Sequence, residues 1–322
     1  MIRAIIGVLS KLFDVIGLLL TPFAATLARL QSRFGPQRLP MSYGIWDRMG
    51  VLPVPYHYYQ PVFDVRSIPD EAWEKQDPLL GVDLRVDDQL ALLGKFDNAA
   101  ELKKISWKKR PGSLDYYYSN ASFLAGDSEI LYNVIRHYHP RKMIEIGSGF
   151  STRMAKAALD QNRKEGDGAS HICIEPFEMP WLERLKDTEI LRSRVEEVDL
   201  GIFGELGEND ILFIDSSHVL RMGGDVYVEY LKILPTLRKG VIVHIHDIYW
   251  PFDYPRGFVK SKRYFWTEQY LLQAFLAFNR DYEVMLALNY LATHHKDALD
   301  KACPVFAQHP GITPGSFWMR RV

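Results

Sequence analysis

From about Asp127 onward, strand-like and helix-like segments alternate along the chain, and this alternation restricts the fold more than any other feature. The strand candidates are short apolar runs at residues 142–147, 171–176, 193–198, 210–215, 240–247, 282–290 and 315–322. Helical candidates lie at residues 127–139, 151–161, 179–187, 225–237 and 267–278. This pattern is typical of a mostly parallel sheet with helices on both faces. We therefore predict an α/β, Rossmann-like, doubly wound sheet of seven strands.

The last two strand candidates, "YEVMLALNY" and "GSFWMRRV", have no long helix between them. Parallel neighbours need a long crossover, whereas antiparallel neighbours can be joined by a hairpin. We expect a hairpin here and therefore a reversed last strand.

An N-terminal extension precedes this pattern, and we divide it into an apolar amphipathic helix over residues 1–35 and an irregular, partly helical accessory region over 36–115. Lys11 and Asp14 make the first segment too polar for a clear membrane span and too broken for a signal peptide. Three roles stay open for residues 1–30: contact with a membrane surface, docking in an apolar groove, or a homo-oligomer contact.

Composition excludes some partners and chemistries. The chain has 322 residues and a net charge of −1, so no global field favours nucleic acid. Its two cysteines, Cys173 and Cys303, form no metal-binding or redox pair, and a reducing, cytoplasmic location fits them best.

The stretch "KMIEIGSGFSTRMAKAAL" reads as a strand, a glycine-rich turn and a helix. Gly147 and Gly149, with Ser148 between them, allow a tight turn close to a ligand. Ser151 and Thr152 can cap the next helix, whose first amides favour anionic groups. Dinucleotides and S-adenosylmethionine are both bound by turns of this kind.

Three residues bear on the choice between a dinucleotide and S-adenosylmethionine. The third glycine of the dinucleotide fingerprint is replaced by Thr152. Glu145, inside the strand, could meet the amino group of S-adenosylmethionine. Glu175, at the end of the next strand, could accept hydrogen bonds from ribose hydroxyls in either class. The balance favours S-adenosylmethionine.

With these residues in place, residues 127–322 resemble class I S-adenosylmethionine-dependent methyltransferases, and we take 116–322 as the methyltransferase domain. "EIGSGFST" is similar to their first motif. Within that group, "ILFIDSSHVLRMGGDVYVEYLKILPTLRKGVIVHIHD" resembles the branch of macrocin O-methyltransferases and cephalosporin-biosynthesis methyltransferases. The resemblance implies that Asn120, in the loop before the first strand, contacts the amino-acid end of the cofactor.

Four polar residues follow the adjacent strands "DILFID" and "GVIVHIHD", and should converge at the carboxyl edge of the sheet. The resemblance implies that Asp215 and Asp247 bind Mg²⁺ and that His218 is the general base. It also places Asp215 beside the cofactor and among the catalytic residues. His246 stands where relatives have an acid; imidazole prefers other metals, so either the metal differs or His246 contacts substrate. His244 reads as a supporting residue.

The segment "YWPFDYPRGFVKSKRYFWTEQY" follows these residues. Long loops at this edge commonly carry function, so Tyr249, Trp250 and Tyr254 are candidates for the wall of an acceptor pocket. Alternatively, the loop packs on the domain surface.

The leading hypothesis is an S-adenosylmethionine-dependent O-methyltransferase, with Mg²⁺ or another divalent metal as a second cofactor. Its acceptor would be a hydroxyl on a sugar, a lipid-linked glycan or a secondary metabolite. The location would be cytoplasmic, with a variant in which residues 1–30 hold the enzyme at the inner face of the membrane. The alternatives are an NAD(P)-dependent oxidoreductase and a non-catalytic, membrane-associated binding protein with the same fold.

Overall fold

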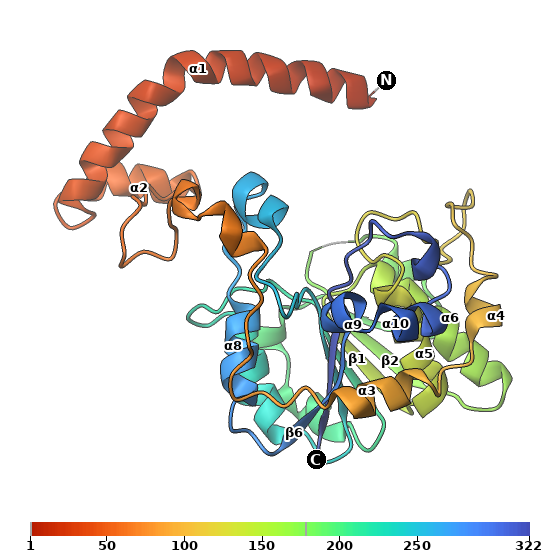
Figure 1. Ribbon diagram of the computed structural model, residues 1–322. Helices are drawn as coiled ribbons and strands as arrows, with labels where there is room; N and C mark the ends of the chain where they lie inside the picture. The colour runs from red at the N-terminus through yellow and green to blue at the C-terminus, as the bar shows by residue number, and fades with distance from the viewer. Residues whose placement is uncertain (1, 178) are drawn as a thin grey trace. The chain divides into compact units, whose positions relative to one another are not determined.

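The computed structural model describes residues 2–177 and 179–322, which separate into two compact units (Figure 1). The first unit runs to Ile68, and the second comprises Pro69–Val322. Residues 69–115, which the sequence grouped with the accessory region, therefore lie in the same unit as the sheet.

The first unit holds α1 (Ile2–Phe34) and α2 (Pro40–Arg48). Figure 1 shows that α1 is bent near its middle, and Pro22 lies inside it. Proline removes a backbone hydrogen bond and crowds the preceding turn, which accounts for the bend. Its segment Ile6–Phe34 has 29 residues and contains an 18-residue window with a mean hydropathy of 1.7, so by length and composition it could cross a membrane.

The second unit is built on a seven-stranded sheet with the order β3-β2-β1-β4-β5-β7-β6. β7 pairs antiparallel with both of its neighbours, and the other pairs are parallel. The strands are β1 (Lys142–Ile146), β2 (Ser170–Ile174), β3 (Glu189–Leu191), β4 (Ile211–Ile214), β5 (Ile242–Ile245), β6 (Tyr282–Ala287) and β7 (Phe317–Arg321). The expected doubly wound sheet with a reversed last strand is confirmed.

Helices cover both faces of this sheet (Figure 1). One apolar cluster joins the sheet to α3 (Val86–Leu93), α4 (Ala99–Leu102), α5 (Asp127–Tyr138), α6 (Phe150–Lys164), α9 (Leu288–His294) and α10 (Lys296–Ala302). The second cluster packs α7 (Asp225–Val228) and α8 (Glu268–Leu276) on the opposite face. Because strands buried on both faces carry continuous apolar runs, β1, β4 and β5 were recognisable in the sequence.

The structure corrects the region between β2 and β4. The strand expected at residues 193–198 is a loop with a 3₁₀ turn over Val195–Glu197, and β3 lies earlier, at Glu189–Leu191. The helix expected at 179–187 is reduced to a 3₁₀ turn over Leu182–Arg184. Met179 and Asp187 have positive φ, a conformation that does not continue a helix, and they limit this segment at both ends.

The end of the chain also differs in detail. The strand expected over 282–290 stops at Ala287, and α9 and α10 separate it from β7. The antiparallel pairing of β6 and β7 was predicted correctly, but two short helices replace the simple hairpin.

Candidate active site

The carboxyl ends of β4 and β5 lie side by side, since Ile214 pairs with Ile245 in register. The chain after these ends brings Asp215, His218 and Asp247 together. His218 Nε2 lies 3.5 Å from Asp215 Oδ1 and 3.4 Å from Asp247 Oδ2. The convergence expected from the topology therefore occurs for these three side chains.

Two of these residues adopt an unfavourable backbone conformation. His218 has φ 59° and Asp247 has φ 57°, both in the left-handed region. Non-glycine residues are held there at a free-energy cost, and such residues concentrate at functional sites. The left-handed conformation at these two positions holds His218 Nε2 within 3.4 Å of Asp247 Oδ2.

The sequence analysis missed Glu268, the first residue of α8. Its Oε2 lies 2.8 Å from His218 Nδ1, and the side chain is 1% exposed. The ring of Trp266 lies 4.4 Å from that of His218. Glu268 is 50 residues from His218 and belongs to an otherwise ordinary helical segment, so no local spacing pointed to it.

Charge is strongly coupled within this cluster. Burial would raise the pKa of Asp215, but the charge of His246 and a hydrogen bond from His218 outweigh it and bring the pKa to about 2. For His218 burial acts in the opposite direction, and the hydrogen bonds of Asp215 and Glu268 overcome it to raise the pKa well above its usual value. A histidine held between three carboxylates thus binds a proton tightly until some of that negative charge is offset.

A divalent cation fits this cluster. One oxygen each from Asp215 and Asp247 and one nitrogen of His218 lie within 4.8 Å of one another. The two carboxylates are hard donors that suit a divalent cation such as Mg²⁺. His246, expected as a ligand, is beside this group: its Nε2 lies 4.0 Å from Asp247 Oδ1, and its ring contacts that of Phe123 at 5.2 Å. Because it continues the strand alternation of β5, it shares a face with His244, and its charge acts on Asp215 from beside the three ligand atoms.

His244 has the supporting role that was expected. Its ring stacks on Phe213 at 3.9 Å, and its Nε2 lies 3.0 Å from Ser316 Oγ. Burial holds its pKa well below the usual value, so it is a neutral part of the core.

The glycine-rich turn after β1 also packs against β4. Gly147 has φ 79°, and a Cβ atom there would lie 1.9 Å from the backbone oxygen of Asp215. Gly149 differs: its φ of −173° is extended backbone, and a Cβ would meet only Met179 Cε at 4.0 Å. The backbone of Ser148 donates to Glu175 Oε2 at 3.1 Å. Carboxylate oxygens accept more than one hydrogen bond, so contact of Glu175 with a ribose stays a prediction.

The structure contradicts the assignment of Glu145 to the cofactor. Its carboxylate is 0% exposed, lies 2.5 Å from His171 Nε2, and accepts hydrogen bonds from Ser151 and Thr152. Burial would lower the pKa of His171, but Cys173 and Glu145 raise it to about 10. Glu145 is therefore one half of a buried ion pair that anchors α6. Ser151 is occupied by that carboxylate, and Gly149 takes the helix cap.

Asn120 is also engaged locally. Its amide oxygen accepts from the backbones of Ser122 and Phe123, and its nitrogen donates to the carbonyls of Tyr117 and Phe123. All of these bonds brace its own loop, so its contact with the cofactor is not supported by the geometry.

The three aromatic residues expected to form the wall of an acceptor pocket lie in different surroundings. Trp250 is 3% exposed and packs on Phe317, and it borders a separate cavity with Gln76 and Gln273. Tyr249 and Tyr254 line a cavity of about 690 Å³ together with Trp73, Phe252, Arg256 and Lys296. Tyr249 Oη donates to Asp247 Oδ1 at 2.6 Å, which links this cavity to the charged cluster.

Comparison with known proteins agrees with this geometry. A family model described as a methyltransferase domain matches residues 144–248, which run from β1 to just beyond β5. An uncharacterised protein of Archaeoglobus fulgidus is 30% identical over 171 residues, covering 49% of this chain and 75% of that protein.

Two solved structures are also similar. One, titled "cmcI-D160 Mg-SAM", has 16% identity and a TM-score of 0.38 and covers 83% of this chain and 90% of its own. The other is a putative protein-L-isoaspartate O-methyltransferase of Plasmodium falciparum with S-adenosyl-L-homocysteine. It has 15% identity and a TM-score of 0.27, and covers 50% of this chain and 76% of its own. These scores are too low to carry an argument.

The family match is what separates the two cofactor classes left by the glycine-rich turn. It covers that turn, Glu175 and the charged cluster, and it favours S-adenosylmethionine over a nicotinamide dinucleotide. Together with the reversed last strand of the sheet, it supports the assignment of the second unit to the class I S-adenosylmethionine-dependent methyltransferases.

Proposed function

We propose that this enzyme transfers the methyl group to a hydroxyl oxygen, with His218 as general base. The observation that carries the proposal is the position of His218 Nε2 at the carboxyl edge, where Glu268 holds the opposite ring nitrogen. Methyl transfer from a sulfonium to a hydroxyl requires loss of the hydroxyl proton near the transition state. A fixed imidazole with one nitrogen directed to the site suits that task.

Glu268 orients His218, and the two aspartates bind a cation. Glu268 accepts from Nδ1–H and so keeps Nε2 available for the acceptor's proton. Asp215 and Asp247 would hold a divalent cation. The cation would supply positive charge beside the acceptor oxygen and offset the carboxylates that His218 faces.

The cavity beside Tyr249 suggests the acceptor class. Its aromatic side chains suit the faces of a sugar or another ring compound, and Arg256 and Lys296 lie at its wall. Both cations have carboxylate partners, Asp70 and Asp300, so they add polarity without a strong demand for an anion. We therefore favour a hydroxyl on a sugar, a lipid-linked glycan or a ring-containing secondary metabolite.

Product analysis tests the proposal. The metal-loaded enzyme with methyl-labelled S-adenosylmethionine and a panel of methyl glycosides, catechols and amines should form O-methyl products, identified by NMR. Dialysis against a chelator should abolish turnover, and added Mg²⁺ or Mn²⁺ should restore it. Methylation of amines alone would overturn the hydroxyl assignment, and chelator-insensitive turnover would overturn the role of the metal.

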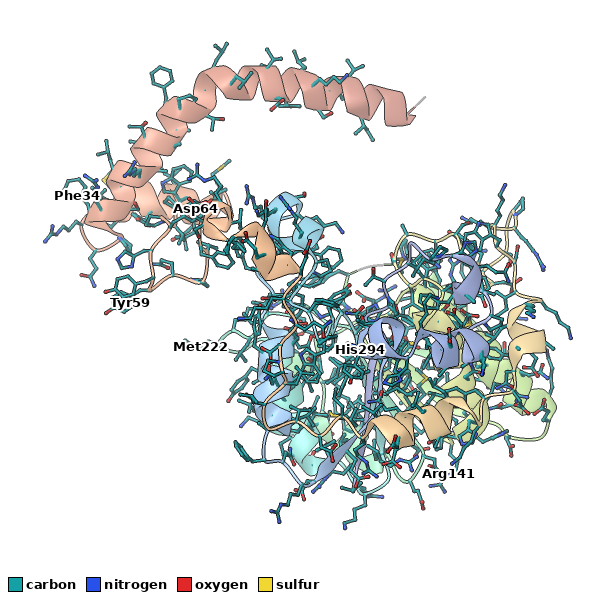
Figure 2. The ribbon with its side chains drawn as sticks, in the orientation of Figure 1. Phe34, Tyr59, Asp64, Arg141, Met222 and His294 are labelled. Carbon is teal, nitrogen blue, oxygen red and sulfur yellow. The ribbon has the colours of Figure 1, made fainter. Side chains whose placement is uncertain are left out.

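A lipid bilayer is the partner we propose for α1. The methyltransferase domain suggests a cytoplasmic location, but most large apolar side chains between Ile6 and Leu30 of α1 are exposed (Figure 2). Leu18, Leu19 and Phe23 are each at least 70% exposed, an arrangement that water disfavours. Arg29 and Arg33 follow near its C-terminal end, where they can meet anionic headgroups.

Vesicle flotation measures this association. The full chain should float with vesicles of phosphatidylcholine and phosphatidylglycerol. The double variant Leu19→Asp/Phe23→Asp should remain at the bottom, because charged groups in the bilayer are costly. Leu80→Asp, at an exposed leucine in the second unit, is the matched control and should float like the parent. Equal flotation of all three chains would rule out anchoring by α1, and self-association without vesicles would favour the homo-oligomer contact.

A further inference from the structure

Arg153, near the start of α6, is a buried cation that forms no ion pair with any residue the structure describes. It is 6% exposed, and its Nε makes no hydrogen bond within the described part of the chain. Its guanidinium carbon lies 3.7 Å from the ring centre of Trp181 and 5.1 Å from that of Phe150. Arginine is rarely buried unless it is paired, because removal of its charge from water is costly. The two ring faces recover only part of that cost.

The side chain lines a cavity of about 260 Å³ on the flank of α6, closed by the segment that follows α4. Five cationic side chains and two acidic ones line this cavity: Lys104, Lys108, Arg110, Arg153, Lys156, Asp115 and Asp160. Lys156 is bonded to Asp160 at 2.9 Å. Among the residues the structure describes, no ion pair involves Lys104, Lys108 or Arg110. The cavity thus concentrates positive charge around an arginine that forms no ion pair within the described residues, and Asp115 at the same wall offsets only part of that charge.

From this geometry we propose that the cavity is a binding site for a phosphate monoester attached to a ring compound. A planar guanidinium with free donors matches phosphate oxygens, and several lysines around it favour a dianion over a monoanion. Tyr116 and Tyr117 supply aromatic wall for the ring that carries the phosphate. The bound anion would provide the partner that Arg153 lacks.

This site is separate from the methyl-transfer site. Arg153 lies on α6 beyond the glycine-rich turn, and the cavity is lined by none of Asp215, His218, Asp247 or Tyr249. Occupancy by the phosphate monoester should therefore be independent of the cofactor.

Calorimetric titration of the full chain with phenyl phosphate tests the proposal. Saturable binding is expected, and Arg153→Gln should weaken it by about tenfold or more, because a charge-assisted hydrogen bond is lost. Lys164→Gln, a solvent-exposed change in the last turn of the same helix, is the control and should bind like the parent. The affinity should also fall as NaCl is raised, since the contacts are ionic.

Three further measurements test the location of the site, its independence of the cofactor and its preference for phosphate. If Arg153→Gln does not fold, the exposed double variant Lys108→Gln/Arg110→Gln should still weaken binding by about threefold or more. Saturating S-adenosylhomocysteine should leave binding unchanged, and competition would place the anion in the cofactor crevice and overturn the proposal. Equal affinity for benzoate would overturn the phosphate assignment, and unchanged affinity in both variants would overturn the site itself.

Discussion

His218→Asn should lower kcat for methyl transfer by about 10²–10⁴-fold, the usual contribution of a positioned general base. Asparagine tolerates the positive φ at this position better than most residues, so the substitution should remove the imidazole without unfolding the turn. Single-turnover kinetics with the metal-loaded enzyme would measure the loss. The affinity for S-adenosylmethionine should stay within about twofold, because His218 makes its contacts to carboxylates at the acceptor side.

Two controls separate base catalysis from other roles of His218. His294→Asn, at an exposed histidine labelled in Figure 2, should have parental kinetics. Metal content of the His218→Asn protein, measured by mass spectrometry, shows whether the imidazole is also a ligand. Glu268→Gln should lower kcat with little change in the acceptor KM, because it loosens His218 without touching substrate. Parental turnover in His218→Asn would remove the base assignment.

The sequence predicted best those elements whose residue pattern is contained in one continuous segment of the chain. β1, β4 and β5 are continuous apolar runs, and residues at their carboxyl ends must meet at one edge; this is why Asp215, His218 and Asp247 were found together. β3 is a three-residue edge strand with partly exposed side chains, so its apolar run is short, and the 193–198 segment was chosen in its place. An edge strand needs less apolar surface because one side of it has no neighbour.

The errors at the site have a common cause in tertiary contacts. Glu145 was assigned to the cofactor because its partner, His171, lies on a neighbouring strand in a register that the sequence does not display. Glu268 was missed because α8 meets the end of β4 only in the folded chain. Trp250 was grouped with Tyr249 and Tyr254 because aromatic residues of one loop have the same local signature, whichever cavity they border. Residue type and spacing therefore located the edge of the site but not which side chains face into it.

Gly147→Ala should destabilise the second unit by about 3 kcal/mol or more and abolish detectable binding of S-adenosylmethionine, because it combines backbone strain with a steric clash. The added Cβ would lie 1.9 Å from the carbonyl oxygen of Asp215 and 2.8 Å from its carbonyl carbon. These are backbone atoms at the end of a central strand. They cannot rotate away as a flexible side chain could, so the turn after β1 or the end of β4 must shift.

Gly149→Ala is the matched comparison, because it adds the same methyl group two residues away. The extended φ at Gly149 suits any residue, and the added atom would meet only the flexible end of Met179. Its stability in urea should stay within about 1 kcal/mol of the parent, the range of an unstrained glycine-to-alanine change. Calorimetry then separates the two roles of the turn. Weak cofactor binding by a stable Gly149→Ala protein would show that the ligand approaches this backbone closely. Equal stability of the two variants would contradict the close packing of the glycine-rich turn against β4, on which the position of Asp215 depends.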